Sequence, residues 1–142
     1  MKTKVLNTIV GIMVSALTYA QEVPVVRAEI PSEARHFLSD HFKSPFHHAI
    51  KDIERNTITY EVVLNDNTEI EFDSGGNWKE VDGKGKAIPY TFIQKQIIDY
   101  VKSEYPKEII TKIEVEPDKY EVELSNGLDL RFNAMGAFVK VD

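Results

Sequence analysis

The sequence predicts an α+β protein in which two tandem units, each a helix followed by four strands, form one antiparallel sheet with both helices packed on one face. Three observations predict this fold. A stretch of 23 residues recurs at an offset of sixty. Each copy alternates apolar and polar side chains with the period of a strand. An amphipathic helical pattern precedes each copy.

The first twenty residues, MKTKVLNTIVGIMVSALTYA, have the pattern of a cleavable signal peptide, with two lysines before an apolar run and a small-residue exit at Ala20. The apolar run is shorter than the roughly 18 residues of a membrane-spanning helix. We therefore expect a periplasmic or secreted protein without a membrane anchor, whose mature chain begins near Gln21.

Composition excludes several classes of function. The chain has no cysteine, which excludes disulfide support, thiol chemistry and thiolate metal ligands. Without Lys2 and Lys4, 15 basic residues against 23 acidic ones leave a net charge of −8. A chain this acidic, with no basic patch, does not suit nucleic acid. A basic protein or a cation fits better, although acidity also serves simply to keep an exported protein soluble.

The first unit, residues 21–82, is predicted to begin with a helix after Pro31. Apolar and aromatic side chains there recur at helical spacing: Ala34, Phe37, Leu38, His41 and Phe42. A strand is expected next, from the apolar side chains Ala49, Ile50 and Ile53.

The recurring stretch supplies the other three strands of each unit. YEVVLNDNTEIEFDSGGNWKEVD (60–82) aligns without a gap with YEVELSNGLDLRFNAMGAFVKVD (120–142). Eight positions are identical: Tyr60/Tyr120, Glu61/Glu121, Val62/Val122, Leu64/Leu124, Phe72/Phe132, Gly76/Gly136, Val81/Val141 and Asp82/Asp142. We interpret this as an internal duplication.

Turn residues separate the predicted strands at the same places in both copies. Asn65-Asp66-Asn67 and Ser125-Asn126-Gly127 tolerate the positive φ that a tight hairpin requires. A second turn, at 73–76 and 133–136, leads into a short last strand. Side chains predicted to face the core include Tyr60, Val62, Leu64, Ile70 and Phe72.

The second unit, residues 88–142, follows the short connector 83–87. A linker this brief favours one structural unit over two independent domains. Its helix is expected to start with a capping box formed by Thr91 and Gln94 and to stop at Pro106. An apolar alternation over 109–115 predicts the strand that follows.

The shared pattern resembles the PepSY-like family of small exported bacterial proteins: YEVxL, a polar turn, an acidic and apolar strand ending in Phe, then Gly, an aromatic and Val-Asp. The second copy is the closer match, since the first has Asn67 where the pattern has Gly. That family is similar in fold to a secreted beta-lactamase inhibitory protein whose concave sheet grips an enzyme. Related PepSY domains occur in protease propeptides. The resemblance implies a non-catalytic binding or inhibitory module and brings no catalytic residues.

Sequence motifs that would indicate a catalytic or metal-binding site are weak. The four histidines His36, His41, His47 and His48 cluster in sequence but lack the spacing of a zinc site. The acidic turn at 65–69 is too short for a calcium-binding loop, and Asx side chains at hairpins more often bond their own backbone. No nucleophile elbow or phosphate loop is present. We therefore expect no enzyme activity, no cofactor and no specific metal site.

The open face of the sheet is the candidate binding surface. Inward Tyr60 and Tyr120 leave acidic side chains pointing outward, and a regular last strand would point the aromatic rings outward as well. The residues proposed to bind a partner are Trp78, Phe138, Glu61, Glu121 and Arg131. The alternative is a bulge at Gly76 and Gly136 that turns both rings into the core.

The leading hypothesis is an exported module that binds a protein or peptide of the cell envelope through this face, with inhibition as one form of that binding. The alternative is a periplasmic carrier of a small ligand or of calcium or zinc. Sequence reasoning leaves the partner's identity and the oligomeric state open.

Overall fold

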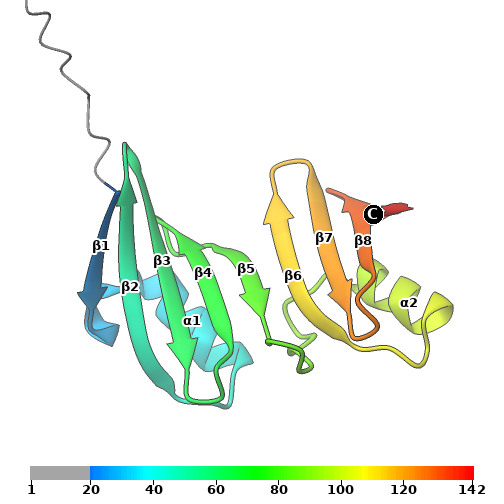
Figure 1. Ribbon diagram of the computed structural model, residues 1–142, viewed down its shortest axis with the longest axis horizontal. Coiled ribbons are helices and arrows are strands. Elements are labelled where there is room, and N and C mark those ends of the chain that lie inside the picture. Colours follow the sequence, from blue (N-terminus) through cyan, green and yellow to red (C-terminus); the bar gives the residue numbers. More distant parts are fainter. Residues whose placement is uncertain (1–19) are drawn as a thin grey trace, which may run out of the picture.

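The computed structural model describes residues 20–142, which form one antiparallel sheet of nine strands with two α-helices (Figure 1). The predicted signal peptide therefore lies outside the described residues, except for Ala20. Sheet order follows chain order, so each strand pairs with its neighbours in sequence. The α+β class and the single antiparallel sheet are confirmed. The strands are β1 Ala20–Val25, β2 Phe46–Glu54, β3 Thr57–Leu64, β4 Glu69–Asp73, β5 Trp78–Asp82, β6 Ile110–Glu116, β7 Lys119–Leu124, β8 Asp129–Asn133 and β9 Phe138–Val141.

The sheet has one strand more than the two sets of four that the sequence predicts. β1 pairs antiparallel with β2 and forms one edge of the sheet. It contains Pro24, which an edge strand tolerates because one side of its backbone has no partner in the sheet. Sequence reasoning missed β1 because Val23 and Val25 alone give too short an alternation.

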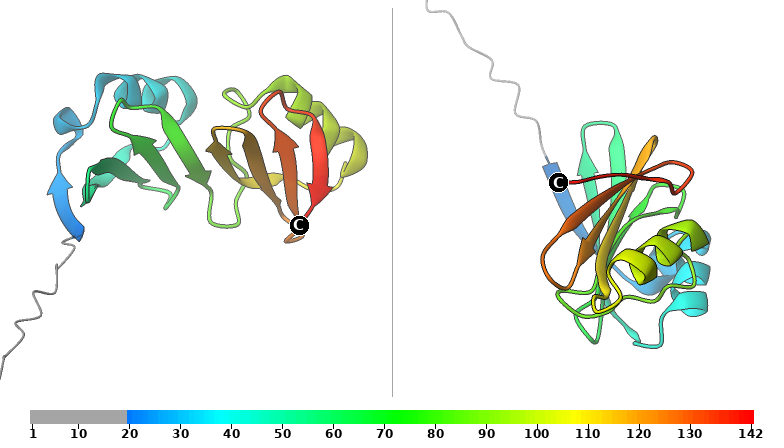
Figure 2. Two further views of the ribbon diagram at one scale, coloured as in Figure 1. Left: turned by 90° about the horizontal axis from the view of Figure 1, so that it is seen from above. Right: turned by 90° about the vertical axis from the view of Figure 1, so that its right-hand side faces the viewer.

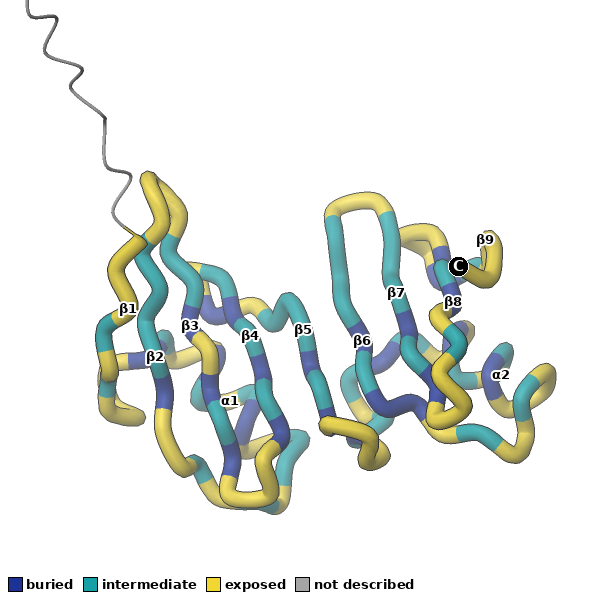
Figure 3. The backbone as a smooth tube through the Cα atoms, viewed as in Figure 1, coloured by how far each residue is buried: buried dark blue, intermediate teal, exposed yellow. Residues whose placement is uncertain are grey.

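Both helices, α1 (Ser32–His41) and α2 (Lys95–Glu104), cover the same face of the sheet (Figure 2). A short 3₁₀ turn, η1 (Arg27–Glu29), precedes α1. Buried positions alternate with accessible ones along β3, β4, β7 and β8 (Figure 3). The face opposite the helices is open to water, as expected for an antiparallel sheet with one covered side.

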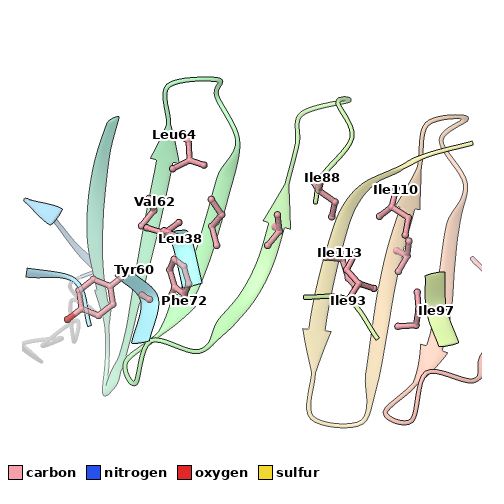
Figure 4. Close-up of a cluster of buried hydrophobic side chains, with 14 of the residues drawn as sticks. Leu38, Tyr60, Val62, Leu64, Phe72, Ile88, Ile93, Ile97, Ile110 and Ile113 are labelled. Atoms are coloured by element: carbon pink, nitrogen blue, oxygen red, sulfur yellow. The ribbon is translucent and has the colours of Figure 1, made fainter. Parts of the chain in front are cut away.

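The core lies between the helices and the covered face (Figure 4). α1 contributes Ala34 and Leu38, and α2 contributes Ile97 and Val101. The five side chains predicted to face inward are buried, and so are four of their five counterparts in the second half, the exception being the half-buried Tyr120. The buried ones are Tyr60, Val62, Leu64, Ile70, Phe72, Val122, Leu124, Leu130 and Phe132.

The helix α2 begins later than the sequence predicts. Its N-cap is Gln94, whose side chain makes no capping hydrogen bond; the amide instead donates to the Tyr120 hydroxyl at 3.1 Å. Thr91 Oγ1 lies 2.7 Å from His41 Nδ1, in a contact between the two halves of the chain. The predicted capping box is therefore wrong, since both side chains take tertiary partners. The stop is confirmed, because α2 ends at Glu104, just before Pro106.

The predicted turns are confirmed by their backbone conformations. Asn67 and Gly127 have φ of 71° and 85°, and Gly76 and Gly136 have φ of 87° and 83°. At Gly76 a Cβ atom would lie 2.8 Å from the backbone nitrogen of Ala34. The turn between β4 and β5 thus packs directly on the first turn of α1, and glycine is required there both by conformation and by space.

The junction of the two halves is a strand pairing. β5 and β6 align Glu80 with Glu114, Val81 with Ile113 and Asp82 with Lys112. The predicted connector 83–87 stays close to this junction: the Gly83 N–H donates to the Thr111 carbonyl at 2.8 Å, and the Ile88 N–H donates to the Ile110 carbonyl at 3.1 Å.

Candidate functional site: the open face of the sheet

A continuous row of glutamates crosses the open face. Each lies directly opposite the next on the neighbouring strand, so all five point to the same side of the sheet. Like charges directly opposite one another destabilise a sheet. This glutamate row consists of Glu61 on β3, Glu71 on β4, Glu80 on β5, Glu114 on β6 and Glu121 on β7.

Basic side chains neutralise two members of the glutamate row. Lys112 Nζ lies 3.3 Å from Glu80. Glu121 forms an ion pair with Lys119 at 3.3 Å and accepts a hydrogen bond from Arg131 at 3.1 Å. Glu121, the member of the row nearest β8, is therefore paired with two cationic side chains.

The other three members, Glu61, Glu71 and Glu114, take part in no ion pair within residues 20–142. The pKa of each is raised above its ordinary value of 4.5. Burial is the largest cause, and the next is a neighbouring negative charge: Glu69 for Glu61, and Glu80 for both Glu71 and Glu114. A cationic group placed over this part of the sheet would relieve the repulsion among these carboxylates, which is the second cause of their raised pKa values.

Three of the five residues predicted to bind a partner lie on this face. Glu61 is exposed, whereas Glu121 and Arg131 are half-buried against each other. Arg131 also pairs with Asp142 at 2.9 Å. Arg131 is thus held in place by two carboxylates and presents little free positive charge.

Trp78 lies on the opposite face, under α1. On β5 one extra residue, Lys79, has no partner on β4, so Trp78 lies opposite the buried Phe72. Its ring stacks on Phe37 of α1 at 6.3 Å between centroids and meets the edge of Phe92 at 5.1 Å. Of the two orientations left open for Trp78, the outward one is therefore wrong, and the bulge that turns the ring to the helix side is confirmed.

Phe138 on β9 is turned to the helix side by a bulge of the same kind. Val139 is the extra residue, and Phe138 lies opposite Phe132. Its ring stacks on Tyr100 of α2 at 4.5 Å between centroids, with 37% of the residue exposed. The outward placement expected for Phe138 is likewise wrong, so neither aromatic residue shares a surface with the glutamate row.

The four histidines do not converge on one site. His41 is bonded to Thr91, and His47 Nδ1 lies 2.7 Å from His48 Nδ1 on β2, while His36 is exposed on α1. Among residues 20–142, no group of three or more His, Cys, Asp or Glu side chains is arranged to hold a metal ion.

Comparison with protein families gives one match. The profile described as "Putative beta-lactamase-inhibitor-like, PepSY-like" matches residues 17–66 and again residues 58–140. Together the two matches span most of the chain. No curated protein matches it.

Solved structures give close matches across the described residues. A "putative calcium-regulated periplasmic protein" from Bacteroides thetaiotaomicron is 33% identical, with a TM-score of 0.82 over 85% of this chain and 96% of that one. Two periplasmic proteins from Bacteroides vulgatus, one of the DUF2874 family and one of unknown function, are 29% and 34% identical, with TM-scores of 0.81 and 0.82. They align over 86% of this chain and over 97% and 99% of their own. Neither α1 nor α2, the two α-helices of residues 20–142, has the length and apolar composition of a membrane span.

Proposed function

The chain belongs to the PepSY-like, beta-lactamase-inhibitor-like family, and from this premise we propose that it is a periplasmic, non-catalytic module that binds a basic surface of another protein or peptide on its open sheet face. The descriptions of the family and of the similar structures indicate no enzyme. The observation that carries the proposal is the glutamate row, and above all its three members without an ion pair.

Electrostatics favour a cationic partner. Glu61, Glu71 and Glu114 lie on three strands of a folded sheet, so a partner meets their charges without ordering any loop. Complementary charge of this kind raises association rates and selects partners by sign. Because the row costs stability in the free protein, binding a cationic surface offsets a repulsion that is already present.

The experiment compares two variants of equal charge. One neutralises the row through Glu61→Gln, Glu71→Gln and Glu114→Gln. The control neutralises three exposed acids off this face through Asp99→Asn, Glu104→Gln and Asp118→Asn. The probe is a decalysine peptide, and binding is measured by isothermal titration calorimetry at low salt.

We expect wild type and the control variant to bind decalysine with similar affinity and the row variant to bind at least about tenfold more weakly. Equal affinity for all three proteins would overturn the proposal. A photo-crosslinking residue at Val63, on the same face, then identifies the partner in the cell envelope. Activity assays on any enzyme captured in this way test whether binding inhibits it.

Calcium binding is the second candidate function. The observation favouring it is the description of the Bacteroides thetaiotaomicron protein as calcium-regulated. On the open face a hollow of about 240 Å³ is lined by five carboxylates and one lysine: Lys112, Glu114, Glu121, Glu123, Asp129 and Asp142. Since no three of the described carboxylates are arranged to hold an ion, calcium would have to draw these side chains together. Calorimetry with CaCl₂ and with MgCl₂ tests this candidate. Heat with calcium that Glu123→Gln abolishes would support it, and no heat at millimolar calcium would remove it.

We also propose that residues 21–82 and 88–142 are two copies of one helix-and-four-strand unit. Equivalent pairs support this: Tyr60 lies opposite Phe72, and Tyr120 lies opposite Phe132. The side chain of Asp73 accepts hydrogen bonds from the N–H groups two and four residues later, as Asn133 does in the second half.

A further inference from the structure

A cleft of about 550 Å³ opens on the helix side of the sheet, at the junction of the two halves. Its walls come from α1, from the turn between β4 and β5, and from the hairpin between β6 and β7. It lies on the opposite face from the glutamate row, so a ligand here does not compete with a partner on the open face. Neither the family description nor the similar structures assign a role to this cleft.

Aromatic rings form the inner surface of the cleft. Phe37, Trp78 and Tyr120 line it. Trp78 is central, with its ring centroid 6.3 Å from Phe37 and 6.4 Å from Tyr120. All three are half-buried, so part of each ring remains open to the cleft. The face of an aromatic ring is the negative pole of its quadrupole and attracts cations.

Carboxylates form the rim. Glu33 and Asp40 lie on α1, whereas Asp73 and Glu116 are the last residues of β4 and β6. Lys79 is the one lysine or arginine among the lining residues. Taking the histidines as neutral, four acids and one lysine give the lining a formal charge of −3. The cleft therefore disfavours anions.

Two rim carboxylates are available to a ligand. Asp73 already accepts hydrogen bonds from the backbone N–H groups of Gly75 and Asn77, and Glu116 pairs with Lys119 at 3.3 Å. Glu33 and Asp40, by contrast, take part in no ion pair within residues 20–142. They lie seven residues apart on α1, two helical turns, and so share one helix face.

We propose that this cleft binds a small organic cation of the alkylammonium class, with its methyl or methylene groups against Trp78 and Tyr120 and its charge toward Glu33 and Asp40. A purely apolar ligand would desolvate the rim carboxylates without compensation. A bare metal ion is disfavoured in this cleft, since the described acidic and histidine side chains around it form no metal-binding group of three. An alkylammonium ion can make cation–π contacts with the aromatic surface and also pair with the carboxylates of the rim.

The single tryptophan of the chain makes the test direct, because Trp78 is the sole indole fluorophore and lines the cleft. Choline is the probe, and its neutral carbon isostere 3,3-dimethylbutan-1-ol is the matched ligand control. We expect choline to change the Trp78 emission saturably at millimolar concentration, with matching calorimetric heat, and the neutral alcohol to have no saturable effect.

Two protein variants complete the test. Glu33→Gln with Asp40→Asn should raise the dissociation constant for choline about tenfold. Asp99→Asn with Glu104→Gln, the same charge change on α2, should leave it unaltered. Unchanged melting temperatures confirm that each variant is folded. The proposal is overturned if choline gives neither saturable emission change nor heat, if the alcohol acts equally, or if both variants bind as wild type does. Because lysine side chains are also alkylammonium groups, the decalysine titration is repeated with saturating choline, so that it reports on the open face alone.

Discussion

Glu80 on β5 lies directly opposite Glu114 on β6, at the junction of the two halves of the sheet. The adjoining pairs are apolar, Val81 with Ile113, and oppositely charged, Asp82 with Lys112. Three residue pairs thus join the two halves into one sheet, and the like-charged pair is the one that is electrostatically unfavourable. Lys112 offsets part of this repulsion through its contact with Glu80, but Glu114 has no such partner in the described part of the chain.

Replacing Glu114 by Gln should therefore stabilise the protein. We expect the free energy of unfolding at neutral pH and low salt to rise by about 0.2–1 kcal/mol, the range for cross-strand pairs. The gain should shrink as salt screens the glutamate row. Urea unfolding at two ionic strengths measures both effects. Glu104→Gln, which removes an exposed acid outside the row, is the control, and a loss of stability in Glu114→Gln at low salt would contradict the argument.

The pH dependence of stability should reflect the same row. The pKa values of Glu61, Glu71 and Glu114 are raised in the folded protein, so the folded state binds more protons than the unfolded state above pH 4.5. Their stabilising contribution is full below that pH and is lost as pH rises through the raised pKa values. Asp66 and Asp73 have lowered pKa values because backbone N–H groups donate to them against the opposing effect of burial. Their contribution is present above pH 3.8 and is lost in more acid solution.

Stability should accordingly be greatest in mildly acidic solution and decline toward neutral pH. Glu71→Gln should flatten the decline between pH 4.5 and neutrality, because it removes the group that faces Glu61 and Glu80. Asp73→Asn should leave that decline in place. Melting temperatures across this pH range measure both, and an identical decline in wild type and Glu71→Gln would refute the assignment.

Most of the fold could be predicted from the strand pattern and from the residue types at the turns. Period-two alternation is a local signal, and it placed Val62 and Phe72 in the core, where the structure has them. The positive φ of Asn67 and Gly127 followed from residue type alone. The start of α2 could not be predicted in this way, because the Thr91 and Gln94 side chains hydrogen-bond to residues distant in sequence. Such tertiary contacts are not visible in the local sequence pattern.

The candidate site was predictable only where strands are regular. Glu61 and Glu121 follow the alternation and lie on the open face as expected. The last strand of each half carries an extra residue, Lys79 or Val139, and one extra residue transfers every side chain before it to the other face. Glycine before an aromatic signalled that alternative, but nothing local to the sequence decided between it and a regular strand.

Gly76→Ala should be strongly destabilising. The residue has φ of 87°, and an added Cβ would lie 2.8 Å from the Ala34 nitrogen and 2.9 Å from Pro31 Cβ. The left-handed conformation alone costs an alanine about 1–2 kcal/mol, and overpacking adds roughly 1–3 kcal/mol. Gly127→Ala is the matched control, since its φ is 85° with nothing within 4 Å of the added Cβ. Equal losses in urea unfolding would show that the turn does not pack on α1 as described.

Replacing Trp78 and Phe138 by alanine, one at a time, shows how much each ring contributes to the stability of the core. Trp78 packs against rings from both halves, including Phe37 and Tyr120, whereas Phe138 packs on Tyr100 at the far edge and is 37% exposed. Trp78→Ala should therefore cost about 3 kcal/mol of unfolding free energy, the low end for a large aromatic residue.

Phe138→Ala should cost clearly less than Trp78→Ala, because part of its surface is already in contact with water. Both variants should retain decalysine binding under conditions where they are folded, since neither ring lies on the open face. Urea unfolding and the calorimetric titration measure the two effects separately. A folded Trp78→Ala protein that lost decalysine binding would place the tryptophan back among the residues that serve the open face, against the geometry of the bulge.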